Sequence, residues 1–369
     1  MKFGIVGLPQ AGKSTVFNLL TQGHVDTRHW GGREEVHIGV AQIFDPKLER
    51  LAGLFKPKKI THATIEYVDL PGVARTDRNG PGDGAERGLS SFLSALKNAD
   101  ALAHVVRAFE DESIPHAEGP IDPARDIALF DLEMIFSDLA VAEKRLERLS
   151  KDLKKMKSAE LEMENEALEK CRSALEAETP LRALPLDDEE DRRLRGFTFL
   201  SAKPLLILLN LGDQDADKLP NLLEVYGLGE HAAKPRVRVT GVCGKIEAEL
   251  AALPEQDARL FMEDLGLAES GPARVVRESY ALLDLITFYT VSENEARAWA
   301  VPRDLPAIRA AGTIHSDFER GFIKAEVVPY DHMLVAGSFH GARSKGMLRI
   351  EGRDYPVKDA DVILFRFNV

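Results

Sequence analysis

Cysteine is scarce in this chain of 369 residues, and long apolar runs are absent from it. Only Cys171 and Cys243 occur, far apart and in no metal-ligand spacing, which argues against a disulfide framework or a zinc site. No apolar stretch approaches the roughly 20 residues that a membrane helix needs. The N-terminal stretch MKFGIVGLPQAGKST turns polar and glycine-rich too early for a signal peptide. We therefore expect a cytoplasmic protein with no membrane partner.

Basic residues are also in the minority. There are 48 Lys and Arg against 60 Asp and Glu, a net charge of −12. An acidic total does not favour nonspecific nucleic-acid binding, so any RNA contact must come from a local basic patch. The hydrophobic share of 44% and charged share of 29% are ordinary for a globular protein long enough for two or three domains.

The N-terminal segment carries a phosphate-loop motif. Residues 2–6 predict a short buried strand, residues 7–14 match G-x-x-x-x-G-K-[ST], and TVFNLLTQ has helical apolar spacing. Loop N–H groups and the helix N-terminus would hold phosphates. Lys13 would reach the β and γ phosphates, and Ser14 would ligate Mg²⁺. The other nucleotide-binding candidates in this loop are Pro9, Gln10, Ala11, Gly12 and Thr15.

A second phosphate element follows in ATIEYVDLPG, residues 63–72. The alternating run predicts a strand that ends in Asp69, which would hold the Mg²⁺ shell. The Gly72 N–H would sense the γ-phosphate, so Lys13 and Gly72 are the catalytic candidates. Val73 stands where many GTPases place a Gln and cannot orient water. We therefore expect slow hydrolysis, or another group in that role.

A base-reading loop is predicted at LLILLNLGD, residues 205–213. Guanine-reading loops carry Asn-Lys-x-Asp, and here Leu211 replaces the Lys. Asn210 can serve N7 of either purine. Asp213 is an acceptor-only group that matches the N–H donors of guanine and opposes N1 of adenine. Asp213, taken alone, favours guanine.

The last nucleotide motif has two candidate positions. Ser201-Ala202-Lys203 has the usual residues, but it precedes the strand that ends in Asn210, so its order in the chain is wrong. Cys243, Gly244 and Lys245 follow a later predicted strand and are the better candidate. A backbone N–H of this second loop would contact the exocyclic group of the purine.

These motifs resemble those of the YchF / Obg-like ATPase family. The similar segments run end to end: GLPQAGKSTVFNLLT, ADALAHVVRAFEDESIPHAEGPIDPARDI, VCGKIEAEL, FMEDLGLAESGPARVVRESYALLDLITFYT, AGTIHSDFERGFIKAEVVPYD and FRFNV. The resemblance implies a base motif of N-x-x-E with ATP preferred to GTP, and a hydrophobic residue at Val73. It also implies a TGS-type C-terminal domain and the ribosome, through its large subunit or its RNA, as partner. We further expect a monomer.

The chain departs from the family pattern in four places, which indicates a divergent paralogue. Asp213 stands where Glu is usual, and Gln10 replaces the loop Asn that helps to bind K⁺ in related proteins. HWGGREEVHIGV replaces the switch I run whose Thr ligates Mg²⁺, with Arg33 in the altered segment and Thr27 out of register. The segment after the D-x-x-G element is changed to RTDRNGPGDGAERGL.

A helical hairpin is predicted within the nucleotide domain. Apolar residues in steps of 3 and 4 form a heptad seam: Leu132, Ile135, Leu139, Ala142, Leu146, Leu149, Leu153 and Met156. Seven Lys and Arg from 144 to 157 are followed by five Glu from 160 to 169. The basic residues could touch RNA phosphates or pair across the hairpin, and we favour pairing for most of them.

The predicted fold is an α/β P-loop G-domain (1–122 and 196–278) with an inserted coiled-coil hairpin (123–195). An α+β, β-grasp-like module (279–369) with one short helix follows. The leading function is an NTPase that binds and slowly hydrolyses ATP, with GTP left open as a second substrate, and acts as a nucleotide-dependent regulator associated with the ribosome or RNA. The alternatives are a GTPase selected by Asp213, and a nucleotide-gated ribosome-binding module with negligible hydrolysis.

Overall fold

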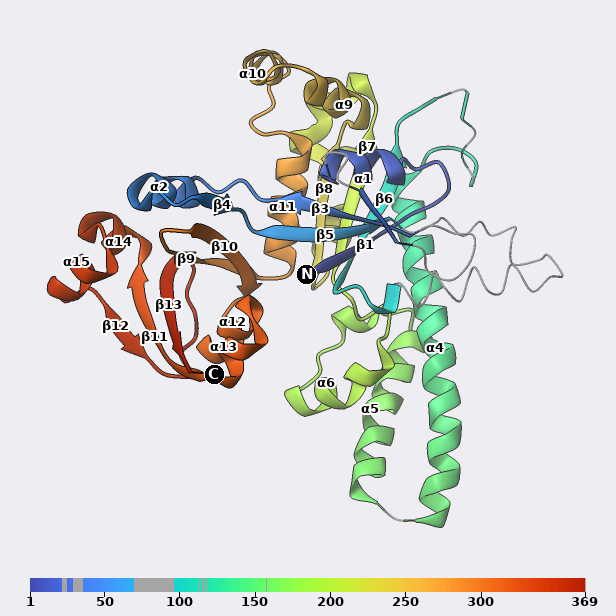
Figure 1. Ribbon diagram of the computed structural model, residues 1–369. Helices are drawn as coiled ribbons and strands as arrows, with labels where there is room; N and C mark the ends of the chain where they lie inside the picture. Colours follow the sequence, from blue (N-terminus) through green and yellow to red (C-terminus); the bar gives the residue numbers. More distant parts are fainter. Residues whose placement is uncertain are drawn as a thin grey trace. The chain divides into compact units, whose positions relative to one another are not determined.

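The chain folds into two compact units in a computed structural model (Figure 1). The structure describes residues 1–21, 25–28, 36–69, 96–111, 113–114, 116, 118–156 and 158–368. The first unit comprises Met1–Val40 with Glu66–Glu278, and the second comprises Ala41–Ile65 with Ser279–Val369. No helix in these described ranges is long and apolar enough to cross a lipid bilayer.

A seven-stranded sheet forms the centre of the first unit. Its order is β2 (Val25–Arg28), β3 (Val36–Gln42), β5 (Thr64–Asp69), β1 (Lys2–Val6), β6 (Ala101–Ala108), β7 (Leu205–Leu211) and β8 (Val237–Val242). The strands from β5 to β8 are parallel. Strands β6 and β7 are buried at every residue, as expected of central strands covered on both faces. Ligands bind such sheets at the carboxyl ends of the strands.

Helices surround this sheet (Figure 1). They are α1 (Lys13–Thr21), α7 (Leu222–Val225), α8 (Gly229–Ala232), α9 (Gly244–Ala252), α10 (Glu255–Asp264) and α11 (Gly271–Leu282), with the 3-10 segment η4 (Asp213–Asn221). The core around β6 and β7 is aliphatic and includes Leu102, Val106, Ile207 and Leu209. Burial of these side chains fixes the central strands, and with them the strand ends that carry the nucleotide motifs.

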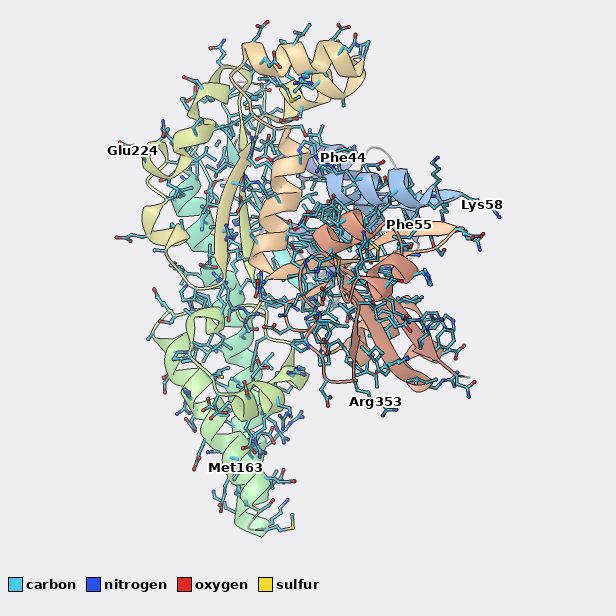
Figure 2. All side chains as sticks on the ribbon, turned by 90° about the vertical axis from the view of Figure 1, so that its left-hand side faces the viewer. Phe44, Phe55, Lys58, Met163, Glu224 and Arg353 are labelled. Carbon is cyan, nitrogen blue, oxygen red and sulfur yellow. The ribbon has the colours of Figure 1, made fainter. Side chains whose placement is uncertain are left out.

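The helical hairpin is formed by α4 (Pro123–Lys155) and α5 (Ala159–Glu176), which lie side by side (Figure 1). Its core includes Ile135, Leu146 and Leu149 from α4 and Leu168 from α5. The predicted seam is wrong at its end, because the Met156 side chain is 64% exposed where α4 stops. Met163, also exposed, lies near the free end of the hairpin (Figure 2).

Pairing across the hairpin explains less of the basic run than predicted. Arg145 makes a two-pronged contact with Glu164, with both N···O distances at 2.7 Å. Lys151 instead bonds Glu147 on its own helix. The remaining basic residues of the run that the structure describes have no ion pair with a described residue: Lys144, Arg148, Lys154 and Lys155. The preference for inter-helix pairing of most of these charges is therefore wrong, because among the described residues one arginine alone reaches the acidic helix.

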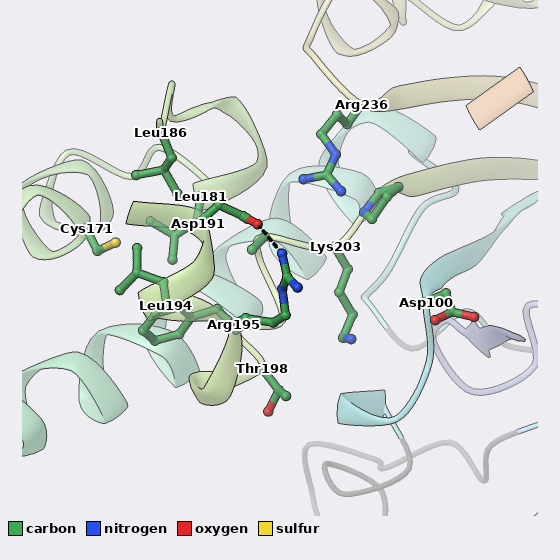
Figure 3. Close-up of a pocket in the computed structure, with 13 residues that line it drawn as sticks. Asp100, Cys171, Leu181, Leu186, Asp191, Leu194, Arg195, Thr198, Lys203 and Arg236 are labelled. Atoms are coloured by element: carbon green, nitrogen blue, oxygen red, sulfur yellow. Dashed lines mark hydrogen bonds and ion pairs between the residues drawn. The ribbon is translucent and has the colours of Figure 1, made fainter. Parts of the chain in front are cut away.

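The segment at residues 201–203 lies at the amino end of β7, away from the phosphate loop. The Asp138 carboxylate accepts the N–H groups of Leu200 and Ser201, at 2.9 and 2.7 Å. Lys203 donates to the carbonyl of Lys97 at 3.0 Å. Ala202 and Lys203 also line a cavity of about 170 Å³ between the sheet and the short helices α6 (Asp188–Leu194), η2 (Leu181–Ala183) and η3 (Arg195–Phe197) (Figure 3). This segment therefore serves packing.

The second unit is built on a six-stranded sheet. Its order is β12 (Arg349–Glu351), β11 (Phe322–Pro329), β13 (Asp361–Phe367), β9 (Leu285–Val291), β10 (Glu295–Pro302) and β4 (Lys59–Thr61). The central strands β9 and β13 are parallel, and β10 and β11 flank them antiparallel. This arrangement is that of a β-grasp sheet. The C-terminal segment adds four helices where the sequence predicts one: α12 (Ala307–Ile314), α13 (Ser316–Arg320), α14 (Tyr330–Ala336) and α15 (Phe339–Ser344).

Residues 41–65 belong to this second unit, although the sequence places them in the nucleotide domain. They form α2 (Pro46–Phe55) and β4, and Figure 2 labels Phe44, Phe55 and Lys58 in this segment. Leu48 and Leu51 of α2 are buried in the same core as Tyr289 of β9. The Tyr289 hydroxyl donates to Asp45 at 2.6 Å. Burial of these leucines on a distant part of the chain is the reason for the different boundary.

Candidate nucleotide-binding site

The phosphate loop joins β1 to α1 in a conformation that requires glycine at two positions. Gly7 has φ +150° and Gly12 has φ +92°, and Gln10 between them also has a positive φ of 63°. A Cβ on Gly7 would lie 2.3 Å from the Val105 carbonyl oxygen. One on Gly12 would lie 2.2 Å from Nδ2 of Asn210. The loop is thus pressed against β6 and β7, so its glycines set its shape.

Lys13 begins α1 and turns its ammonium group back over the loop. Nζ donates to the carbonyl oxygens of Gly7 and Leu8 at 3.1 and 2.9 Å. Burial lowers the pKa of Lys13, and the nearby Asp69 carboxylate opposes that shift. The ammonium group is therefore held where a phosphate bound by the loop would meet it. Of the other loop candidates, Ala11 is buried, Pro9 is half-buried, and Gln10 and Thr15 are exposed.

Ser14 and Asp69 form the predicted metal-holding pair. The Ser14 hydroxyl donates to Oδ2 of Asp69, at the end of β5, over 3.1 Å. Burial raises the pKa of Asp69, while the Ser14 hydrogen bond and the charges of Lys13 and His37 lower it. Hydroxyl and carboxylate oxygens are ligands that Mg²⁺ accepts alongside water and phosphate, so these residues fit that ion. Gly72 and Val73 lie outside the described residues.

Asn210 connects the phosphate loop to the predicted base-reading loop. Nδ2 donates to the Ala11 carbonyl at 3.1 Å, and Oδ1 accepts the Gly244 N–H at 3.3 Å. Both contacts are satisfied only in this orientation of the amide. Nδ2 carries a second N–H besides the one it donates to Ala11, and this is the donor that the predicted N7 contact requires. A residue predicted to read the base is therefore also a brace between the two loops.

Asp213 and Lys245 lie together at the outer end of this region. Lys245 Nζ donates to Oδ2 of Asp213 at 2.7 Å, and the Lys245 and Asp213 side chains are 73% and 43% exposed. The hydrogen bond to Asp213 raises the pKa of Lys245. The sequence predicts that a backbone N–H of the 243–245 loop contacts the exocyclic group of the purine. The Gly244 N–H instead donates to Oδ1 of Asn210.

Two other candidates turn their side chains into the core. Leu211 is buried among the aliphatic residues that cover β7 and β8, and Cys243 is buried beside them. Burial raises the pKa of the Cys243 thiol to about 11. Any contact of these two residues with a nucleotide would therefore come from their backbone, which the sequence could not distinguish from a side-chain contact.

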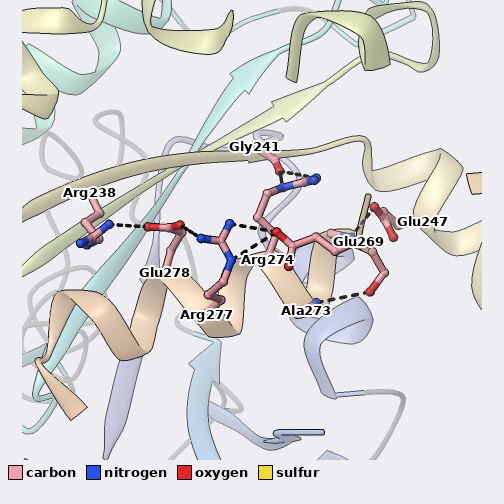
Figure 4. Close-up of polar contacts among 10 residues, drawn as sticks. Arg238, Gly241, Glu247, Glu269, Ala273, Arg274, Arg277 and Glu278 are labelled. Atoms are coloured by element: carbon pink, nitrogen blue, oxygen red, sulfur yellow. Dashed lines mark hydrogen bonds and ion pairs between the residues drawn. The ribbon is translucent and has the colours of Figure 1, made fainter. Parts of the chain in front are cut away.

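Helix α11 holds the second loop in place (Figure 4). Glu247 of α9 is buried and accepts the Gly271 N–H at 2.6 Å. Arg274 donates through Nε and Nη2 to the Gly241 carbonyl at 3.1 and 3.0 Å. These bonds tie both β8 and α9 to α11, so the loop between them has a fixed position.

Arg107 is a site-shaping residue that the sequence reasoning missed. It lies opposite Asn210 in the β6–β7 register and is buried. Its guanidinium donates to the carbonyls of Phe109 and Ile114, at 3.1 and 2.9 Å, and lies 4.5 Å from the Phe109 ring. A charged residue in the apolar run ALAHVVRA is the signal that could have identified it.

Comparisons with known proteins agree on the family. The model for 50S ribosome-binding GTPases matches residues 2–144. The YchF-GTPase C-terminal model, described as a protein of unknown function, matches residues 285–368. The ribosome-binding ATPase YchF of Bacillus subtilis is 39% identical over 367 residues, 99% of each chain. That of Haemophilus influenzae is also 39% identical, over 100% of this chain and 99% of its own.

A solved structure supports the same assignment. The Schizosaccharomyces pombe YchF GTPase superposes with a TM-score of 0.81 at 26% identity, covering 99% of this chain and 97% of its own. The likeness therefore spans both compact units, and the full-length relatives are more than 30% identical. The chain belongs to the YchF family of P-loop nucleotide-binding proteins.

Proposed function

We propose that this protein is a P-loop nucleoside triphosphatase that slowly hydrolyses ATP, also accepts GTP and acts on the ribosome. The observation that carries the proposal is the meeting of Lys13, the Ser14–Asp69 pair and Asn210 at the carboxyl ends of parallel strands. The Asn210 side chain thereby joins the loop that would bind phosphate to the loop that would read the base.

The residues divide the work by their chemistry. Loop N–H groups and Lys13 would bind and orient the β and γ phosphates, and Gly72 would contact the γ-phosphate. Ser14 and Asp69 would hold Mg²⁺, which neutralises charge on the phosphate oxygens when bound. Asn210, Asp213 and the 243–245 loop would position the purine. Val73 offers no group to orient water, so we expect slow turnover without a partner.

The ribosome is proposed as partner because the curated relatives are named ribosome-binding ATPases. We place the contact on the large subunit or its RNA and expect a cytoplasmic monomer. The basic residues of α4 that lack an ion pair with a described residue, such as Lys154 and Lys155, are suited to RNA phosphates. The β-grasp unit is proposed as the TGS-type module.

Two measurements test this function. Single-turnover assays with and without ribosomes should show phosphate release that disappears in Lys13→Ala. If the wild type releases no phosphate in either condition, the proposed triphosphatase activity is overturned. A nucleotide-gated binding module would then be favoured, the alternative suggested by Val73 in place of a water-orienting Gln. Calorimetry with ATP and GTP tests the base. A preference for GTP above about tenfold, or 1.4 kcal/mol, would favour the GTPase that Asp213 suggests.

A further inference from the structure

The ion pair between Asp213 and Lys245 bears on how the site chooses its base. Lys245 lies in the first turn of α9, and Asp213 begins η4, separated from the end of β7 by Gly212 alone. Their 2.7 Å contact joins the two loops next to the Asn210 bridge. The geometry points to the Lys245 side chain as the residue that lets this Asp-containing loop accept adenine. This inference rests on the proposed function and assigns its base specificity.

The chemistry follows from donors and acceptors. A bare Asp213 carboxylate accepts only, so it suits the N–H donors of guanine and repels N1 of adenine. The Lys245 ammonium group donates only. Together they present one acceptor and one donor, which can take a hydrogen from the adenine exocyclic amine and give one to N1. For guanine, the Asp213 carboxylate is shared with Lys245 and accepts less well from the base, while Lys245 gives a new hydrogen bond to O6. Guanine therefore still binds, but without a large affinity advantage over adenine.

The position of Lys245 is otherwise unfavourable. The N-terminal end of a helix carries partial positive charge, which repels a cation in the first turn. Asp213 offsets that repulsion through its hydrogen bond and its charge, and the charges of Glu249 and Asp111 add to the effect. The Lys245 and Asp213 side chains remain 73% and 43% exposed, so a base could reach them without displacing packed residues.

The test compares ATP and GTP affinity, each with Mg²⁺, by calorimetry on the full chain. Lys245→Met keeps the aliphatic stem and removes the donor. It should lower the ratio of ATP to GTP affinity by roughly 10- to 150-fold, the range of one hydrogen bond that involves a charged group. Lys245→Arg should keep most of the ratio. Asp213→Asn in the Lys245→Met background should restore ATP binding, because an amide offers both a donor and an acceptor.

The outcomes separate this inference from the proposed function. An unchanged ratio in Lys245→Met, or equal weakening of both nucleotides, would overturn the specificity role while leaving the triphosphatase intact. Failure of the wild type to bind either nucleotide would overturn the proposed function itself. Thermal unfolding of each variant checks the fold, and the exposed position of Lys245 makes a folding defect unexpected.

Discussion

Replacing Asn210 by Ala should weaken phosphate binding as well as base binding. The amide holds the Ala11 carbonyl at 3.1 Å and the Gly244 N–H at 3.3 Å, and it is 5% exposed. Removing the amide leaves two buried backbone groups without a hydrogen-bond partner, and each unsatisfied group costs about 1–3 kcal/mol. Loss on the Ala11 side alone predicts weaker phosphate binding by about 5- to 150-fold.

Tripolyphosphate separates the two roles of Asn210, because it has phosphates and no base. We expect Asn210→Ala to weaken tripolyphosphate in a competition titration, and to weaken ATP further through the lost N7 contact. Asn221→Ala, which removes an exposed amide, is the matched control. If tripolyphosphate affinity changes by less than about twofold while ATP affinity falls, the bracing role is refuted and Asn210 only reads the base.

Three further predictions concern the loop, pH and a buried ion pair. Gly12→Ala should abolish ATP binding, because the new Cβ would lie 2.2 Å from Nδ2 of Asn210. Gly53→Ala in α2 is the control: its Cβ meets nothing within 4 Å, and the variant should raise the free energy of unfolding in urea by about 0.5–1 kcal/mol. Burial lowers the pKa of His104 to about 3, so on acidification the unfolded chain binds the proton first and the free energy of unfolding falls as the pH drops below about 6.5. His104→Phe should make the free energy of unfolding depend less on pH in this range. Equal pH dependence of the wild type and the variant would contradict this prediction. Arg182→Met removes the closer of two cations beside the buried Asp131 carboxylate and leaves Lys234 at 3.8 Å, so it should cost up to about 3–5 kcal/mol in chemical unfolding. The double variant with Asp131→Asn should lose less stability, and equal losses would count against the ion pair.

Much of the first unit is predictable because its signals are local. The phosphate loop lies between a strand and a helix that follow directly in the chain, and its glycines are required by the backbone angles at Gly7 and Gly12. The hairpin is recognisable because helical periodicity is written in consecutive residues. The end of the hairpin seam at Met156 cannot be recognised in this way, because periodicity does not reveal how far the opposing helix extends.

Long-range contacts are beyond the same reasoning. Asn210 and Ala11 are 199 residues apart, and Asp213 and Lys245 are 32 apart. Residues 41–65 join the second unit because α2 buries its leucines with Tyr289, whose hydroxyl bonds Asp45 across 244 positions of the chain. Sequence order specifies which backbone conformations each segment favours, whereas packing of distant apolar surfaces sets which segments meet. The contact between Asp213 and Lys245, on which the inferred choice of base rests, is such a meeting.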